Sequence, residues 1–470
     1  MCAGIIEFGI IALLIFSPLP AASVEEWSVL VIELVALLMA AAYLIMERKP
    51  EVNGSLSRSV RWPKLFWAGF FLVLLIQAVP FPSFLIKILS PAAHRYRSLY
   101  GADGAGPNLL SFSIIPSLTF QKALELLSYF IIGWLVFRTV TRKRQIYRLL
   151  AVPLAMGMFQ AFYGLLELLT DHPRLLFYRK IYNLDSVTGT FVNRNHLSAY
   201  LEMIIPLAIG LAMARTELFS SSRMSWRQRI VRLSEKGLSI NLLIGLGIFL
   251  MAVALVFSKS RSGVFVLVIS FLLFFGLISL FSQLSGAHKK GIKNFLKALF
   301  FLIVFFAVGL GIDSTLRRFA LDDLLHERRP MYWSYAVRTF LQHSLLGTGL
   351  GTFGSLAPPL EGRSGPVSIG HAHNDYLEYA SELGILGFSL FFGGILTMVL
   401  MSWRVWRTRH HPEVIGLALG GIVSLAGILL HSLTDFNLHI PANMLLFSVV
   451  LPLTLVTAFY RKEPSPGESR

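Results

Sequence analysis

Long apolar runs recur along the whole chain, and polar residues are concentrated between them. A membrane-spanning helix needs roughly 20 mostly apolar residues to cross about 30 Å of hydrocarbon. About twelve windows meet this requirement. They are residues 4–20, 27–46, 64–83, 121–140, 149–169, 197–214, 240–258, 263–282, 298–312, 382–402, 414–432 and 441–460. The pattern predicts an all-α polytopic membrane protein with about twelve transmembrane helices.

The polar segments are too short for a separate soluble domain, so we expect one membrane domain over residues 1–470. Three of these segments are long, at 84–120, 170–196 and 313–381. The last precedes the tenth predicted helix. Its residues from Pro330 to Leu341 have helical spacing, and the closely spaced glycines that follow predict a turn between helices.

Composition supports a membrane protein, with 55% hydrophobic and 14% charged residues and a mean hydropathy of +0.65. The net charge of +16 is shared among short loops, which argues against a nucleic-acid surface. If the N-terminus is cytoplasmic, about 26 of the 42 Lys and Arg lie inside, as the positive-inside rule requires. They are Arg48, Lys49, Arg58, Arg61, Lys64, Arg138, Arg142, Lys143, Arg144, Arg148, those from Arg215 to Lys236, Lys289, Lys290, Lys293, Lys297, Arg404, Arg407, Arg409, Arg461, Lys462 and Arg470.

The single cysteine, Cys2, excludes an internal disulfide and any cysteine-based metal site. The first apolar window is short and contains Glu7. The charged start of a secretory signal is missing, so this window is predicted to remain as a membrane anchor.

Polar clusters lie where predicted spans meet the outer face. The clusters are Gly189–Tyr200, Ser258–Gly263, His371–Glu378 and His431–His439. The candidate binding residues in and near them are Asn193, Asn195, His196, Lys259, Arg329, His371, Asn374, Glu378 and Asp435, beside Arg194, Arg261 and His373. Because the 258–263 link is short, Arg261 is held firmly at the surface, as a phosphate-binding cation should be.

Simpler roles are open for each cluster. Arg261 and Lys259 could snorkel to lipid headgroups, and Asn193 to His196 could cap a helix that also attracts an anion. Glu378 could pair with a loop arginine. The stretch containing His371 and His373 lacks a zinc signature.

If the helix of the tenth span includes His373, then His373, Tyr376, Ala380, Gly384 and Gly387 share a stripe, which aims the imidazole above the bundle. Asn374, Glu378 and Glu382 would then lie on the adjacent stripe and could orient the histidine or a sugar hydroxyl.

These residues resemble the O-antigen ligase superfamily, which includes O-antigen and exopolysaccharide polymerases and protein O-oligosaccharyltransferases. The most specific likeness is His373-Asn374, nine further residues, and then Gly384-Ile-Leu-Gly387. The arginine positions 194 and 261, the twelve spans and the long outer loop before the tenth extend the resemblance over most of the chain.

The resemblance implies transfer of a glycan from undecaprenyl diphosphate to an acceptor hydroxyl, at the periplasmic face of the bacterial inner membrane. It further implies inversion at the anomeric carbon, with no metal and no nucleotide or other cofactor. Arg194 and Arg261 would stabilise the diphosphate, and His373 would activate or orient the acceptor.

Several alternatives differ in the acceptor or in the class of protein. Lipid A core as acceptor gives a ligase, the interpretation we place first; a growing glycan gives a polymerase, and a protein hydroxyl gives an oligosaccharyltransferase. The rival class is a polysaccharide or lipid transporter, because Glu33, Glu167 and Glu202 fall within predicted spans.

Overall fold

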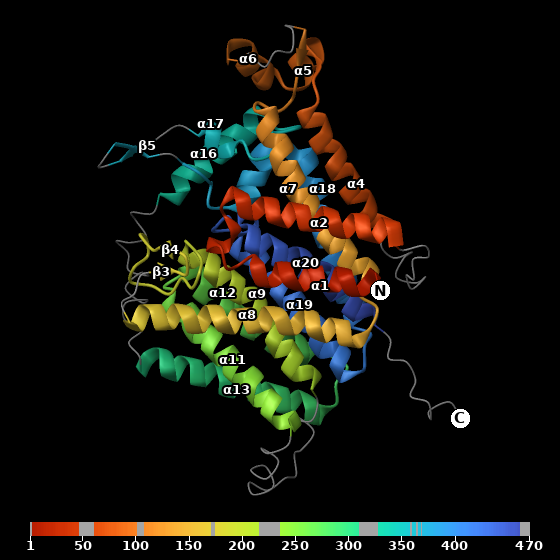
Figure 1. Cartoon of the computed structure of the whole chain (residues 1–470), viewed down its shortest axis with the longest axis vertical. Coiled ribbons are helices and arrows are strands. Elements are labelled where there is room, and N and C mark those ends of the chain that lie inside the picture. Colours follow the sequence, from red (N-terminus) through yellow and green to blue (C-terminus); the bar gives the residue numbers. More distant parts are fainter. Residues whose placement is uncertain are drawn as a thin grey trace, which may run out of the picture.

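The computed structural model describes residues 2–46, 61–100, 108–170, 174–215, 236–309, 328–357, 360–362, 365–367 and 369–460 (Figure 1). Several predicted features lie outside these residues: the end of the ninth span at 310–312, the basic residues at 48, 49, 58 and 223–232, and the tail from 461.

A helix occupies each predicted span. These helices are α1 (Cys2–Phe16), α2 (Glu26–Met46), α4 (Arg61–Ala78), α7 (Pro116–Thr139), α8 (Lys143–Thr170), α9 (Arg194–Ala214), α11 (Lys236–Phe257), α12 (Arg261–Leu280), α13 (Gly286–Gly309), α18 (Asp375–Trp406), α19 (Pro412–His431) and α20 (Pro441–Phe459). Within the described residues, nine helices are long and apolar enough to cross a membrane; α1 is a shorter apolar helix. The all-α polytopic fold is thereby confirmed.

Short elements connect these helices. They are η1 (Ala21–Ser23), β1 (Phe81–Pro82), α5 (Ser83–Leu89), α6 (Pro91–Tyr100), β2 (Leu109–Leu110), β3 (Arg174–Leu175), β4 (Tyr178–Arg179), α16 (Arg329–Gln342), α17 (Phe353–Leu356), β5 (Leu360–Gly362), β6 (Gly365–Val367) and η4 (Asn437–His439). Among the described residues the strands form two-stranded antiparallel sheets, β1 with β2, β3 with β4 and β5 with β6. The helix predicted after Pro330 is α16.

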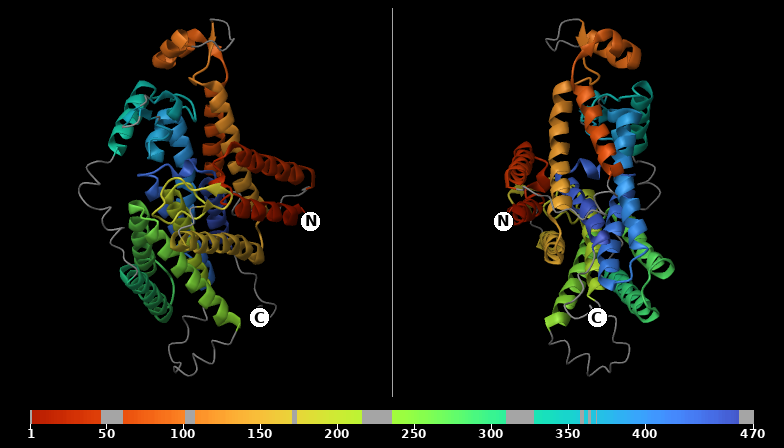
Figure 2. Two further views of the ribbon diagram at one scale, coloured as in Figure 1. Left: turned by 60° about the vertical axis from the view of Figure 1, so that its left-hand side comes forward. Right: turned by 90° about the vertical axis from the view of Figure 1, so that its right-hand side faces the viewer.

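The centre of the bundle is α9, whose apolar window is completely buried. It packs against α19 through glycines: a Cβ added to Gly210 would lie 2.5 Å from the carbonyl oxygen of Gly416. Small residues at such a contact allow two helix backbones to approach closely. Figure 2 shows α1 and α2 together at one edge of the bundle, where α2 also packs on α7.

The predicted glycine turn, residues 345–353, packs against a break in α18. Gly384 has φ 61° and interrupts the helix. The Gly349 amide donates to the Glu382 carbonyl at 2.9 Å, and the Ile385 amide donates to the Ser344 carbonyl at 2.7 Å. A Cβ on Gly347 or on Gly384 would collide with the other segment's backbone. The first glycine of the family-like motif, Gly384, therefore fixes the turn against α18.

Successive membrane helices run in opposite directions, so α9, α12 and α18 all begin at the same end of the bundle, here called the site end. If this end faces the periplasm, cysteines placed at Ser285 and Arg404 should resist a membrane-impermeant thiol reagent, whereas one at the exposed Ser355 should react. The sequence alone predicts that a cysteine at Pro358, in the long outer loop, would also react, but Pro358 lies outside the described residues. Labelling in the opposite sense would reverse the orientation. The buried Cys2 should be replaced first.

Candidate functional site

Three helices begin with an arginine near the polar clusters: α9 at Arg194, α12 at Arg261 and α16 at Arg329. The side chain of Asn193 caps α9 by accepting from the Asn195 amide, and Ser260 caps α12 by accepting from the Gly263 amide. The capping function predicted for Asn193 is thus present. A helix N-terminus carries partial positive charge, so α9 and α12 add to the attraction of their own arginines for an anion.

Asp435 is a buried carboxylate that lies close to several of the predicted site residues. Its Oδ1 lies 3.0 Å from His373 Nδ1, and its Oδ2 accepts a 2.6 Å hydrogen bond from the Asn195 amide group. An Arg329 guanidinium nitrogen lies 3.7 Å from Oδ2, and His196 Nε2 lies 3.8 Å from Oδ1. The side chain of Asp435 is 0% exposed. The structure therefore brings together four of the predicted binding residues with the predicted catalytic histidine.

Burial alone would raise the pKa of the Asp435 carboxyl, but His196 and His373 hold that pKa well below its usual range. Because His196 Nε2 is beyond hydrogen-bonding distance, we attribute the larger share of this lowering to His373. Asp435 is then ionised at neutral pH. A carboxylate bound to Nδ1 fixes the imidazole ring and leaves Nε2 as the nitrogen that can take up a proton.

A second carboxylate–histidine group lies beside the first. His371 Nδ1 is 2.7 Å from Glu378 Oε1, and the Ala372 amide donates to Oε2 of the same carboxylate. His439 Nδ1 is 2.7 Å from Asp375, while its Nε2 is 3.5 Å from Glu378. Burial would lower the pKa of His439, but Glu378 and Asp375 raise it to about 9. His439 is consequently an imidazolium at neutral pH.

The ring of Phe436 joins the two groups. It stacks on His371 with ring centroids 3.9 Å apart and meets His373 and His196 edge to face at 4.8 and 4.7 Å. His373 also stacks on Tyr332 of α16 at 5.9 Å. The imidazole rings therefore have few alternative orientations, which is what a site needs to hold a reacting group in place.

A polar cavity of about 570 Å³ opens beside the second group. Its lining includes His371, Glu378, His439, His196 and Asn193, together with Lys122 and Glu125 of α7. Lys122, Glu125, Asp375 and His439 are not among the binding residues predicted from the sequence. The first two are a lysine and a glutamate three residues apart within a predicted span, joined by a 2.7 Å ion pair, and that spacing was the available signal.

The predicted helical stripe through His373 is wrong. Helix α18 begins at Asp375, and Asn374 is its N-cap, accepting from the Leu377 amide. His373 precedes the helix with φ 52°, a backbone region that is unfavourable for most residues other than glycine. Glu378 orients His371, whereas Glu382 accepts from the backbone amides of Gly351 and Phe353 and orients no histidine.

The remaining predicted residues have structural contacts. The Lys259 ammonium lies 2.8 Å from the exposed carboxylate of Asp185, and Asn374 donates to the Leu433 carbonyl. Of the acidic residues that favour a transporter, Glu202 bonds His431 at 3.0 Å and Glu167 bonds Lys180 at 2.8 Å. Both acidic residues are thus held in buried pairs.

Residues 246–392 match the family model described as O-antigen ligase. The matched region runs from within α11 to within α18 and contains Arg261, Arg329 and His373. No curated protein matches the chain. The match confirms the resemblance to the O-antigen ligase superfamily and indicates a membrane enzyme of ligase or polymerase type.

Proposed function

With the likeness to O-antigen ligases as the premise, we propose that this chain transfers a glycan from undecaprenyl diphosphate to an acceptor hydroxyl at the periplasmic face of the inner membrane. The observation that carries the proposal is the His373–Asp435 pair, 3.0 Å apart, among the arginines that begin α9, α12 and α16. Such a site offers a proton acceptor beside an anion site, as this transfer needs.

In this proposal Arg194 and Arg261 stabilise the negative charge of the leaving diphosphate. When the bond between the sugar and the diphosphate breaks, negative charge accumulates on the departing diphosphate. A guanidinium presents two parallel N–H donors that match a pair of phosphate oxygens, and it keeps its charge at any physiological pH. Both arginines are half-buried, so water screens their charge less than on an open surface.

In this proposal His373 activates the acceptor hydroxyl by taking its proton. The acceptor hydroxyl gives its proton to Nε2 as its oxygen attacks the anomeric carbon from the face opposite the diphosphate, and the diphosphate leaves with the bonding electrons. This single displacement inverts the anomeric configuration. Asp435 stabilises the imidazolium that results, as a buried carboxylate does for other catalytic histidines.

A transporter is the less favoured function. Transport sites lie near the middle of the membrane, on ionisable groups that substrate or ions can reach. Here Glu202 and its partner His431 are completely buried, and the described polar cavity lies toward the site end.

The proposal predicts that purified protein in lipid nanodiscs transfers glycan in the presence of a strong chelator, because arginines supply the charge stabilisation. The chelator is a demanding test, since ligand atoms of His371, Glu378 and His439 lie within 4.8 Å of one another, as those of a metal site would. Transfer to an added acceptor should be measured with and without chelator. Complete loss that a divalent ion restores would refute the metal-independent mechanism.

A further inference from the structure

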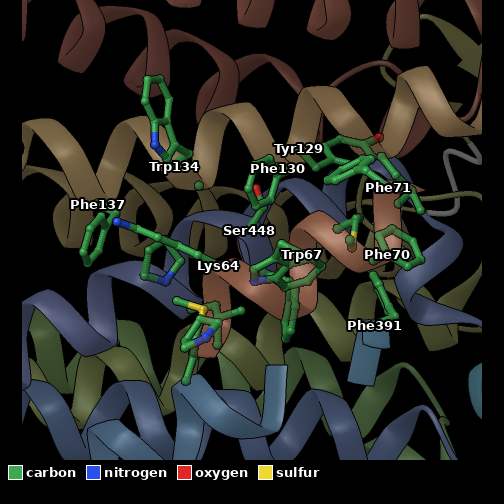
Figure 3. Close-up of a pocket in the computed structure, with 18 residues that line it drawn as sticks. Lys64, Trp67, Phe70, Phe71, Tyr129, Phe130, Trp134, Phe137, Phe391 and Ser448 are labelled. Carbon is green, nitrogen blue, oxygen red and sulfur yellow. The ribbon is translucent and has the colours of Figure 1, made fainter. Parts of the chain in front are cut away.

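Two of the described cavities differ in the ligand atoms that they offer. An aromatic groove lies along α7, between α4, α18 and α20 (Figure 3). Its aromatic side chains include Trp67, Phe70, Phe71, Phe130, Phe137 and Phe391. Neither a histidine nor a carboxylate lines this groove, whereas His371, Glu378 and His439 all line the polar cavity. An ion that needs such ligands therefore fits the polar cavity and not the groove.

His371, Glu378 and His439 are arranged like the ligands of a metal ion. Their ligand atoms all lie within 4.8 Å of one another. His439 Nε2 is 3.5 Å from Glu378 Oε1, and a tetrahedral ion with ligands at about 2.0–2.2 Å holds them roughly 3.3–3.6 Å apart. The distance of 2.7 Å between His371 Nδ1 and Glu378 Oε1 is shorter, because a hydrogen bond joins these atoms. Shifts of about 1 Å would place all three residues on one ion.

Neighbouring groups direct the ligand atoms of His439 and Glu378 toward each other. Asp375 binds His439 Nδ1 at 2.7 Å, which leaves Nε2 to face Glu378. This Nε2 atom is buried and has no hydrogen-bond partner. The Ala372 amide donates to Glu378 Oε2, so Oε1 is the oxygen that can bind an ion. A carboxylate on the far nitrogen of a histidine is the usual support of a metal ligand.

Charge and ligand type indicate which class of ion fits. The carboxylates of Glu378 and Asp375 balance a divalent ion, which takes the place of the proton on His439 Nε2. Two imidazoles with one carboxylate favour Zn²⁺ or a similar transition metal, whereas Ca²⁺ and Mg²⁺ prefer oxygen ligands. His371 is part-exposed and lines the polar cavity, so an ion can enter from the cavity and keep one coordination position open toward it.

The neighbouring His373–Asp435 pair does not offer an equivalent site. Asp435 Oδ2 accepts a hydrogen bond from Asn195 and lies 3.7 Å from an Arg329 guanidinium nitrogen. Because a cation already lies beside this carboxylate, a second cation would be repelled. The ion is therefore expected at the second histidine group alone.

We propose that His371, Glu378 and His439 bind one divalent transition-metal ion, Zn²⁺ by preference, which ties the loop before α18 to η4 across the first turn of α18. The inference is independent of the proposed function, because neither His373 nor Asp435 is a ligand. Protein stripped of metal should still transfer glycan. Loss of transfer on stripping would refute the metal-independent mechanism, whereas absence of metal binding would refute this site alone.

The test titrates Co²⁺ into metal-stripped, full-length protein that carries no histidine tag, in lipid nanodiscs. Tetrahedral Co²⁺ absorbs visible light much more strongly than the octahedral ion in water, so the spectrum reports the geometry of the site. We expect wild type to bind about one Co²⁺ with a tetrahedral spectrum, and Zn²⁺ to displace it. His439→Gln should abolish this spectrum at a Co²⁺ concentration that saturates wild type. Asp375→Asn, which removes the support of His439, should weaken binding about 10–100-fold.

The matched control is His410→Gln, which removes an exposed histidine beyond the other end of α18 and should bind Co²⁺ like wild type. An ion that binds only the folded protein also stabilises it. Zn²⁺ should accordingly raise the unfolding temperature of wild type and His410→Gln but not that of His439→Gln. A tetrahedral spectrum that persists in His439→Gln, or that is lost in His410→Gln, would overturn the inference.

A measurement on wild type decides the matter if His439→Gln does not fold. X-ray absorption at the zinc edge should show two imidazole nitrogens in a shell of nitrogen and oxygen ligands at about 2.0–2.1 Å. A shell of oxygens alone, a sulfur ligand, or failure of wild type to retain zinc would overturn the inference.

Discussion

Replacing His373 with alanine is expected to lower glycan turnover by roughly 10²–10⁴-fold while leaving donor binding close to wild type. In the proposed mechanism the imidazole, which Asp435 holds at 3.0 Å, is the proton acceptor, whereas the donor's diphosphate contacts the arginines. Donor binding and transfer should therefore be measured separately on protein reconstituted in lipid. Normal transfer by this variant would exclude His373 from the chemical step.

Backbone conformation complicates the alanine variant, because His373 has φ 52°. Asparagine adopts this left-handed region more readily than alanine does. His373→Asn thus keeps the loop geometry while removing the imidazole proposed to accept the proton. We expect it to lose as much turnover as His373→Ala; recovery of turnover in the asparagine variant would mean that backbone geometry, and not proton transfer, is what His373 contributes.

The matched comparison is His371→Ala, because Glu378 holds His371 in the same manner at 2.7 Å. We expect a much milder loss, since His371 lines the polar cavity and its described hydrogen bond is to Glu378, whereas Asp435 bonds His373. If His371→Ala is inactive while His373→Ala transfers normally, the Glu378–His371 pair is the base and the two histidines exchange roles.

The spans could be predicted because a helix that crosses hydrocarbon must be long and apolar, and such helices can be recognised from local composition. The histidine register could not be predicted in the same way. Asn374 caps α18, so the helix begins after it. Residues before Asn374 belong to a loop, and their directions do not follow the 100° rotation per residue of a helix. The direction of the side chain of a histidine with positive φ cannot be predicted from the periodicity of the sequence.

Pairings between distant residues were also beyond the sequence. His373 and Asp435 are 62 residues apart, and His439 and Asp375 are 64 apart. Each residue was visible as an unusual polar group near a membrane boundary, which is why Asp435 could be selected, but its partner depends on how α18, α19 and α20 pack. The same holds for the aromatic groove, whose walls come from four helices spread over most of the chain.

Replacing Arg194 or Arg261 with alanine should lower the transfer rate by about 10²–10³-fold, the usual cost of removing one charge-assisted contact from a preorganised site. Unlike the His373 variants, these variants should also weaken binding of undecaprenyl diphosphate itself, because the proposed contact is with the diphosphate in both the ground and the transition state. Binding of undecaprenyl diphosphate and rate of transfer should be measured on the same preparations.

Lysine variants separate charge from geometry at these two positions. Lysine retains the positive charge but not the planar pair of donors, so Arg194→Lys and Arg261→Lys should recover only a small part of the lost rate. The control is Arg179→Ala, which removes the same charge from the exposed β3–β4 hairpin and should leave transfer unchanged. Full rescue by lysine would show that a point charge suffices. Normal donor binding in both alanine variants would place the diphosphate elsewhere, and the charged cavity wall at Lys122 and His439 would then be the next place to test for it.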